Sequence, residues 1–223
     1  MASYAFIPAR GGSTRIKDKN LQTIGGVSLV ARAIRVANEA QLEAWVSTDS
    51  AEIAEEAQRH GAFVDIRRPE YAGGHAQIED ALADWIHRAE IDPEDMIVLL
   101  QPTTPFRSPS TVLLCLLEAE EHGACLTVES APGTWFVGVG VEGRVVWRNS
   151  RRQERPRSQD LQAYLREDGN VYAFTGAHFD RHGLRMHPTE SRYVESEAHE
   201  AFEIDWVDDL VVARAMVAAG VCR

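Results

Sequence analysis

The sequence predicts an α/β fold, a mostly parallel and doubly wound sheet within a single domain over residues 1–223. Three observations predict it. Short apolar runs alternate with helical segments from residue 4 to residue 129. The run 95–100 (DMIVLL) is continuously apolar, which is typical of a parallel strand covered on both faces. Hydrophobic residues make up 44% of the chain and charged residues 26%, so the chain can bury a sizeable core.

Local patterns predict each element of the first half in turn. Residues 4–8 (YAFIP) form an apolar run that ends at a glycine loop, which predicts a buried strand. Apolar positions at helical spacing predict a helix over 28–40 with Ser28 as its N-cap. Residues 48–50 (TDS) can cap a helix over 51–60, and Gly61 is suited to end it. The other elements predicted are strands at 43–47, 62–66, 95–100 and 124–129 and helices at 78–89 and 110–122.

The pattern changes after residue 130. Residues 136–147 (FVGVGVEGRVVW) alternate around Glu142–Gly143, which predicts a hairpin. A charged, irregular stretch follows at 150–157. A further strand is predicted over 170–174, and an amphipathic helix over 207–219 closes the chain.

The overall charge limits the partners of the protein. The formal net charge is −11 and the isoelectric point lies near 5.2, so the surface as a whole should repel nucleic acids and anionic membranes. The N-terminus has no signal-peptide pattern, and no stretch reaches the roughly 20 apolar residues of a membrane span. Three cysteines without CxxC spacing indicate reduced thiols. We therefore expect a cytoplasmic protein.

A basic, glycine-containing loop follows the first predicted strand. The stretch IPARGGSTRIKDKN (7–20) carries four cations in an acidic chain, at Arg10, Arg15, Lys17 and Lys19. Glycine amides can point at phosphate oxygens, arginines offer forked donors, and a lysine offers a point charge. The loop therefore favours polyphosphate binding. The plain alternative is a tight strand-to-helix turn with solvated basic residues.

Seven blocks in order resemble the CMP-sialic acid synthetase family of cytidylyltransferases. The blocks are IPARGGSTRIKDKN, VSTD (46–49), RPE (68–70), LLQPTTPFR (99–107), RSQDL (157–161), GNVY (169–172) and EID (203–205). The resemblance spans about four fifths of the chain. It implies a Rossmann-like nucleotide-binding sheet, in which residues 131–166 form a small β-hairpin extension for dimerisation and for the acceptor side.

The resemblance also implies a reaction and its partners. An oxygen of an anionic small-molecule acceptor, a 2-keto sugar acid such as a sialic or other nonulosonic acid, attacks the α-phosphate of CTP. The products are a CMP ester and pyrophosphate, Mg²⁺ is the cofactor, and the enzyme is a homodimer.

The resemblance assigns roles to positions of this sequence. Catalysis falls to Arg10, Lys19 and Asp205. Nucleotide binding falls to Arg10, Gly11, Gly12, Ser13, Arg15, Lys19, Asn20, Arg68 and Ala76. The acceptor is assigned to Gln101, Arg157 and Gln159, and the metal to Glu203 and Asp205. Two carboxylates at i and i+2 point to one face if the segment is extended, which suits Mg²⁺.

Several alternatives remain open. Glu203–Asp205 can instead be an exposed acidic edge with Asp205 as a helix N-cap. Asp49 can be a second acidic group near the phosphates or the cap of the next helix, and we favour the cap. The acceptor can also be an octulosonic acid or a small phosphonate such as phosphonoformate. Thr14, Glu203 and Asp168 depart from the family pattern and would suit a non-catalytic nucleotide-binding protein. A sugar-1-phosphate nucleotidyltransferase would not predict the LLQPTTPFR and RSQDL blocks.

Overall fold

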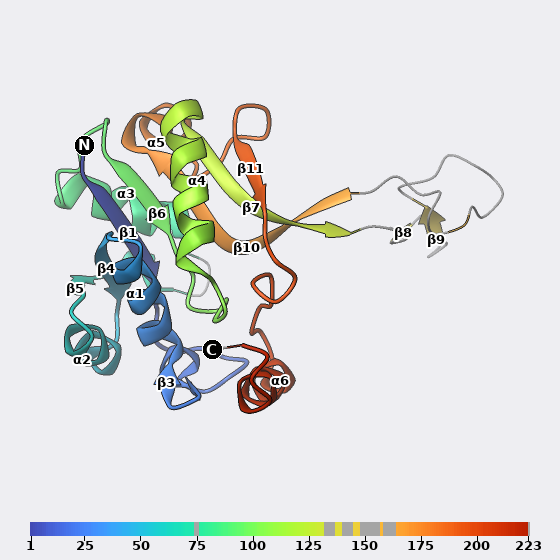
Figure 1. Cartoon of the computed structure of the whole chain (residues 1–223). Helices are drawn as coiled ribbons and strands as arrows, with labels where there is room; N and C mark the ends of the chain where they lie inside the picture. The colour runs from blue at the N-terminus through green and yellow to red at the C-terminus, as the bar shows by residue number, and fades with distance from the viewer. Residues whose placement is uncertain (74–75, 132–136, 140–144, 148–156, 158–163, 223) are drawn as a thin grey trace.

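The computed structural model describes residues 1–73, 76–131, 137–139, 145–147, 157 and 164–222. Its centre is a seven-stranded sheet with the order β11-β7-β10-β6-β1-β4-β5 (Figure 1). The strands are β1 (Ser3–Pro8), β4 (Glu43–Thr48), β5 (Phe63–Ile66), β6 (Met96–Leu99), β7 (Ala124–Ala131), β10 (Tyr164–Thr175) and β11 (Arg192–Glu195).

The sheet is mostly parallel, as predicted. β1 pairs in parallel with β4 and β6, β4 with β5, and β11 with β7. β10 runs antiparallel to both β6 and β7. The strand predicted over 170–174 is the end of β10, which begins six residues earlier at Tyr164. β11 was not predicted, because its four residues are largely exposed at the sheet edge and carry no clear apolar pattern.

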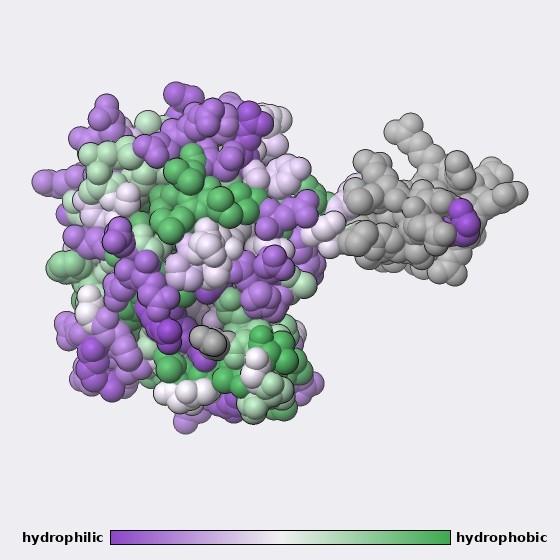
Figure 2. Space-filling model, viewed as in Figure 1, coloured by the Kyte–Doolittle hydropathy of each residue, from purple (hydrophilic) through white to green (hydrophobic). Residues whose placement is uncertain are grey.

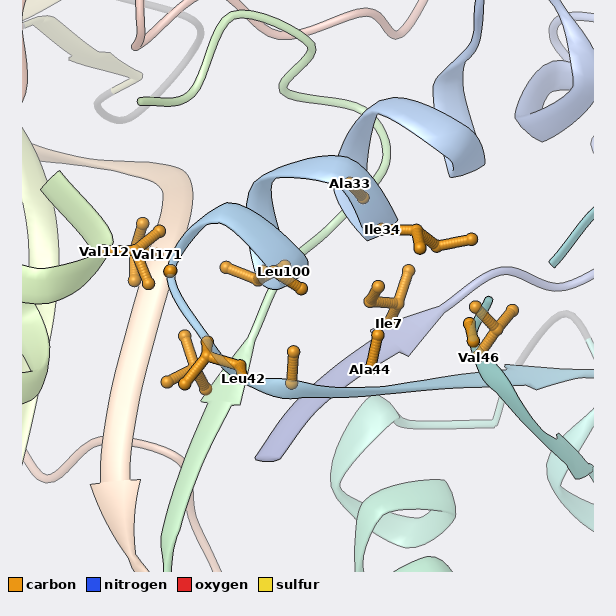
Figure 3. Packing of buried hydrophobic residues seen from close by; sticks show 14 of the residues in the cluster. Ile7, Ala33, Ile34, Leu42, Ala44, Val46, Leu100, Val112 and Val171 are labelled. Atoms are coloured by element: carbon orange, nitrogen blue, oxygen red, sulfur yellow. The ribbon is translucent and has the colours of Figure 1, made fainter. Parts of the chain in front are cut away.

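Helices cover both faces of the sheet. The helices α1 (Leu29–Glu39), α2 (Ala51–Arg59) and α4 (Pro109–His122) pack on one face, in a cluster with Ile7, Val46 and Val98 (Figure 3). The helices α3 (Ile78–Arg88) and α5 (Gly176–His182) pack on the other, with Phe6 and Leu99. Residues 6 and 7 of β1 thus bury side chains on opposite faces, as a strand covered on both sides requires.

The structure confirms the N-caps predicted for α1 and α2 and the predicted end of α2 at Gly61. The hydroxyl of Ser28 accepts from the amide of Ala31 at 3.2 Å, and the hydroxyl of Ser50 accepts from the amide of Ile53 at 3.4 Å. Gly61 follows α2 with φ +80, in the left-handed region that glycine adopts without strain. α5 was not predicted; it is a short helix that begins directly where β10 ends.

A third cluster lies beneath the basic loop. It joins α6 (Val207–Ala218), the ribbon of β2 (Thr23–Ile24) and β3 (Val27–Ser28), and buried residues that include Ile16 and Ile204. α6 is less amphipathic than expected, since Val211 and Val212 face outward while Leu210 and Ala213 are buried. Figure 2 shows apolar surface over α6 and over α4, where Leu113, Leu114 and Leu117 are exposed.

The predicted hairpin is present in its described part. β8 (Val137–Val139) pairs antiparallel with β9 (Val145–Trp147), while Glu142–Gly143 and Trp135–Phe136 lie outside the described residues. The hairpin stands apart from the seven-stranded sheet, beyond the ends of β7 and β10 (Figure 1). Among the described residues, no helix has the length and apolar character needed to span a membrane.

Candidate active site

A basic cleft opens at the carboxyl ends of β1 and β6. Because these neighbouring strands are parallel, the loops that follow Pro8 and Leu99 meet at one edge of the sheet. The described residues that line the cleft are Pro8, Arg10, Ser13, Thr14, Arg15, Ile16, Lys19, Asn20, Gln101, Pro102 and Thr103. Three of them are cations and none is a carboxylate, so the cleft suits an anion although the chain is acidic.

Hydrogen bonds to fixed neighbours hold the basic loop. The amide of Gly11 donates to Oδ1 of Asp49 at 2.6 Å. Asn20 is buried, and its Nδ2 donates to the carbonyl of Arg10 at 2.9 Å. Gly12 has φ +64, a conformation that glycine adopts at little cost. The loop therefore has a defined shape before any ligand binds.

Asp49 is not the helix cap that the sequence predicted. Ser50 caps α2, and Asp49 reaches back across the sheet edge to Gly11. The reason is the tight packing of the two loops, since a Cβ at Gly11 would lie 3.2 Å from Cβ of Ser50. Gly11 and Gly12 line a hollow with Asp49 and Ser50 that adjoins the basic cleft through Arg10 and Ser13.

The acidic segment 203–205 runs extended against the second loop of the cleft. Ile204 is fully buried, and its amide donates to the carbonyl of Thr103 at 2.8 Å. Glu203 and Asp205 therefore project away from the core on the same side, as predicted, although the segment is not part of a sheet. Asp205 is not an N-cap: the amides of Asp205 and Trp206 donate to the carboxylate of Asp209 at 2.9 and 2.7 Å.

Asp205 contacts two cations of the basic loop. Its carboxylate lies 2.9 Å from Arg15 and 3.3 Å from Nζ of Lys19, and Lys19 also donates to the carbonyl of Ile204 at 3.1 Å. The guanidinium of Arg15 lies 5.2 Å from the centre of the Trp206 ring. The basic loop and the acidic segment thus face one another although 186 residues separate Lys19 from Asp205.

Glu203 lies at the same junction. Thr103 donates to its Oε1 at 3.5 Å. The pKa of Glu203 is raised, first by lost hydration of its carboxyl and second by the negative charge of Asp205, while Lys19, Arg15 and the Thr103 hydrogen bond oppose the shift. Carboxylate oxygens are hard ligands, and a divalent cation such as Mg²⁺ bound between these two carboxylates would also reduce their mutual repulsion.

Gln101 faces the turn that carries Gly169. Its Nε2 donates to the carbonyl of Gly169 at 3.4 Å. A Cβ at Gly169, where φ is +70, would lie 3.4 Å from Nε2 of Gln101 and 3.9 Å from Oε1 of Glu203. These are ordinary contact distances, so the positive φ, and not a lack of space, favours glycine at this position.

Arg107 is a structural residue of the site that the sequence analysis did not single out. It is buried, and its Nε donates to the carbonyl of Asn170 at 2.8 Å and to Oδ1 of Asn170 at 2.9 Å. Its Nη2 donates to the carbonyl of Gln101 at 3.0 Å. Burial lowers the pKa of Arg107, against the charges of Asp168 and Glu200. The sequence feature that could have identified Arg107 is its position as the last residue of the LLQPTTPFR block.

Asp168 also has a structural role. It is buried, and its Oδ1 accepts from the hydroxyl of Thr127 at 2.6 Å and from the amide of Asn170 at 2.9 Å. These bonds hold the irregularity of β10 between Glu167 and Tyr172. Asp168, which departs from the family pattern, thus stabilises the turn beside Gln101 through these two hydrogen bonds.

Three further predicted residues, Arg68, Ala76 and Arg157, do not line the basic cleft. Arg68 pairs with Asp84 of α3 at 3.2 Å, and the amide of Ala76 donates to the carbonyl of Gly73 at 3.1 Å. Arg157 is exposed, and Gln159 lies outside the described residues. Arg67 was overlooked: it is buried, and its guanidinium donates to Ser47 at 3.0 and 3.2 Å.

The geometry defines a class of protein before any comparison. A doubly wound sheet with a glycine-containing basic loop after its first strand, opposite two carboxylates, is the arrangement of a nucleotide-binding enzyme of the phosphoryl-transfer type. A family model described as cytidylyltransferase matches residues 4–210. The chain belongs to the cytidylyltransferase family, and it is a CTP-dependent nucleotidyltransferase.

Individual relatives confirm the resemblance to the CMP-sialic acid synthetase group. The chain is 28% identical over 221 residues to CMP-N,N'-diacetyllegionaminic acid synthase of Legionella pneumophila. The aligned region covers 92% of this chain and 91% of the relative. It is 31% identical over 184 residues to N-acylneuraminate cytidylyltransferase of Oncorhynchus mykiss, covering 79% of this chain. The chain matches 42% of the length of that second relative.

Solved structures share the fold. The structure of CMP:2-keto-3-deoxy-manno-octonic acid synthetase complexed with CTP covers 99% of this chain with a TM-score of 0.69 and 21% identity. The 2-C-methyl-D-erythritol 4-phosphate cytidylyltransferase of Thermus thermophilus covers 98% with a TM-score of 0.60 and 23% identity. The predicted Rossmann-like α/β class is confirmed.

Proposed function

We propose that this protein transfers CMP from CTP to a 2-keto sugar acid of the sialic or nonulosonic type, releases pyrophosphate and requires Mg²⁺. A hydroxyl oxygen of the acceptor forms a bond to the α-phosphorus while the bond from that phosphorus to the bridging oxygen of pyrophosphate breaks. The hydroxyl proton passes to solvent. The protein's contribution is positioning and charge stabilisation.

One observation carries the proposal: Asp205 contacts Arg15 and Lys19, so the acidic segment and the phosphate-binding loop form one site. Arg10, Ser13, Arg15 and Lys19 would hold the triphosphate with the amides of Gly11 and Gly12. The side-chain carbonyl oxygen of Asn20 would accept from the nucleotide, since its Nδ2 already donates to the carbonyl of Arg10. Arg68 and Ala76 would contribute to nucleotide binding at the rim.

Glu203 and Asp205 fit a magnesium ion. Both are hard oxygen donors beside the basic loop, and the pKa of Glu203 is raised first by lost hydration and then by the charge of Asp205, a repulsion that a bound cation would relieve. The ion would neutralise charge on the phosphates and lower the pKa of the acceptor hydroxyl. Glu203 and Asp205 would hold it, and Lys19 would orient Asp205 through their ion pair at 3.3 Å.

The acceptor would bind on the side of Gln101. The side-chain amide of Gln101, which lines the basic cleft, can donate to a carboxylate of the acceptor. Arg157 and Gln159 would join it from the extension over residues 131–166. We propose that this extension, which carries the β8–β9 hairpin, packs against a second copy of the chain in a homodimer.

The experiment is a pyrophosphate-release assay with Mg²⁺ and CTP, against a panel of nonulosonic acids, an octulosonic acid and small phosphonates. We expect turnover with a nonulosonic acid and CTP, and none with ATP, GTP or UTP. Turnover only with a phosphonate such as phosphonoformate would replace the proposed acceptor class. Tight CTP binding with no release for any acceptor would favour a non-catalytic nucleotide-binding protein.

Paired variants test the metal assignment. Asp205→Asn and Glu203→Gln keep the size of each side chain and remove one charge. We expect each to lower kcat by at least about 100-fold, as removal of a group acting on developing charge does. Retention of full turnover by folded Asp205→Asn protein would exclude the assignment. Excess Mg²⁺ should partly restore the activity of Glu203→Gln.

A further inference from the structure

Three histidines gather at the end of α5. The rings of His178 and His182 lie 4.7 Å apart between centres, and those of His182 and His187 lie 4.4 Å apart. Glu190 joins them: its carboxylate lies 3.1 Å from Nε2 of His182 and 3.9 Å from Nδ1 of His187. One ligand atom from each of His182, His187 and Glu190 lies within 4.8 Å of the others.

The cluster lies at the opposite edge of the sheet from the active site. α5 begins after Thr175, which pairs with Met96 at the start of β6, whereas the cleft lies beyond the end of β6 at Gln101. None of the cluster residues lines the basic cleft. The nucleotide reaction therefore does not explain why these side chains meet.

The separations between the ligand atoms are within about 1.5 Å of those in a zinc coordination shell. Zinc binds nitrogen and oxygen ligands at about 2.0–2.1 Å, so two ligand atoms of a tetrahedral site lie about 3.3 Å apart. His182 lies 3.1 Å from one carboxylate oxygen of Glu190 and His187 lies 3.9 Å from the other, and the ligand atoms of all three residues lie within 4.8 Å of one another. Rotation of the His187 ring and of the Glu190 carboxylate would close the remaining gap, since both side chains are partly exposed.

Hydrogen bonds between His187 and Ser191 order the chain around the cluster. The amide of His187 donates to the hydroxyl of Ser191 at 2.7 Å, and the amide of Ser191 donates to the carbonyl of His187 at 3.1 Å. On α5, His178 and His182 are four residues apart and lie on one face, so the buried His178 ring fixes the orientation of His182. The backbone that carries the ligands is thus held in place before an ion arrives, so that only rotation of the His187 and Glu190 side chains is needed.

The donor set selects the kind of ion. Two imidazoles and one carboxylate suit zinc and its transition-metal neighbours, whereas Mg²⁺ and Ca²⁺ prefer shells of oxygen. Three protein ligands also leave a position for water. We propose that His182, His187 and Glu190 form a binding site for one divalent transition-metal ion of the zinc class.

Such an ion would join α5 to the start of β11. The turn that holds His187 and Glu190 leads directly into β11, which pairs with β7 at the edge of the sheet. Ser196, just past β11, accepts from Nδ2 of Asn170 at 3.1 Å, so this edge supports the turn beside Gln101. The bound ion would stabilise the folded chain, because it binds the folded state in preference to the unfolded one.

The test measures Zn²⁺ binding to untagged protein by calorimetry, and Co²⁺ binding by visible absorption. We expect about one Zn²⁺ per chain at this site, a tetrahedral Co²⁺ spectrum, and a higher Tm with Zn²⁺. His187→Ala should weaken Zn²⁺ binding at least about tenfold and remove the Co²⁺ spectrum and the Tm increase. Glu190→Gln is the second variant. It keeps the volume of the side chain and tests the site if His187→Ala is unstable.

His122→Ala is the matched control. His122 also lies at a helix end beside carboxylates, 3.9 Å from Glu118 and 3.7 Å from Glu121, but with a single imidazole. This variant should keep the Zn²⁺ affinity, the Co²⁺ spectrum and the Tm increase. Unchanged Zn²⁺ binding and Co²⁺ spectra in both His187→Ala and Glu190→Gln would overturn the proposal, as would a Co²⁺ spectrum without tetrahedral bands in the parent protein.

Discussion

The backbone amide of Gly11 donates a 2.6 Å hydrogen bond to the carboxylate of Asp49, 38 residues along the chain. The bond ties the basic loop after β1, which we propose binds phosphate, to the junction between β4 and α2. It places a negative charge beside a loop that is expected to hold phosphates, so Asp49 both shapes the loop and opposes its ligand. These two effects can be separated by substitution.

Asp49→Asn and Asp49→Ala should change CTP affinity in opposite directions. Asparagine keeps an oxygen that accepts from Gly11 and removes the charge, so CTP should bind about twofold more tightly. Alanine loses the acceptor and leaves the loop unanchored, so binding should weaken about tenfold. Calorimetry with CTP measures both. Weaker binding by Asp49→Asn, equal to that of Asp49→Ala, would show that the charge and not the hydrogen bond is required.

Gly11→Ala tests the close approach of the two loops. The new Cβ would lie 3.2 Å from Cβ of Ser50, closer than ordinary contact, so the loop must shift and CTP binding should weaken about tenfold. Ser50→Gly removes the opposing atom, and glycine is tolerated at an N-cap. The double variant should therefore recover to within about threefold of the parent. A double variant as weak as Gly11→Ala would show that the contact with Ser50 is not the cause.

Arg15 and Lys17 form a matched pair of cations on one loop. Arg15 lines the cleft and pairs with Asp205 at 2.9 Å, whereas Lys17 is exposed and does not line it. We expect Arg15→Ala to weaken CTP binding about tenfold, since a charge-assisted contact to phosphate is lost. Lys17→Ala should change the affinity less than about twofold. Equal losses in both variants would mean that general charge, and not position, attracts the triphosphate.

Arg107→Met should destabilise the fold before it affects chemistry. It removes the donor to the carbonyl and Oδ1 of buried Asn170 and one of the donors to the carbonyl of Gln101, and the free energy of unfolding should fall by about 3–5 kcal/mol. For a chain of this length Tm should fall by about 10 °C. Arg166→Ala is the control: Arg166 is exposed and pairs with Glu129 at 2.7 Å, and its loss should cost less than about 1 kcal/mol. Thermal unfolding measures both variants, and similar Tm values would contradict the structural role of Arg107.

Several parts of the site could be read from the sequence because they are local. The basic loop is a contiguous segment, and its position after an apolar strand predicts where its cations lie. The i and i+2 spacing of Glu203 and Asp205 predicts that they share a face, and the buried Ile204 between them confirms it. Ser28 and Ser50 cap helices through bonds to amides three residues away.

By itself the sequence determined the order of strands and helices, since apolar periodicity reports which face of a segment is buried. Only the tertiary structure decided which segments meet: the antiparallel placement of β10, the bond of Asp49 to Gly11, and the histidines of α5 beside Glu190. The physical reason is that pairing depends on the shape and charge of distant segments packed together. A local pattern carries no information about the side chain that will lie opposite.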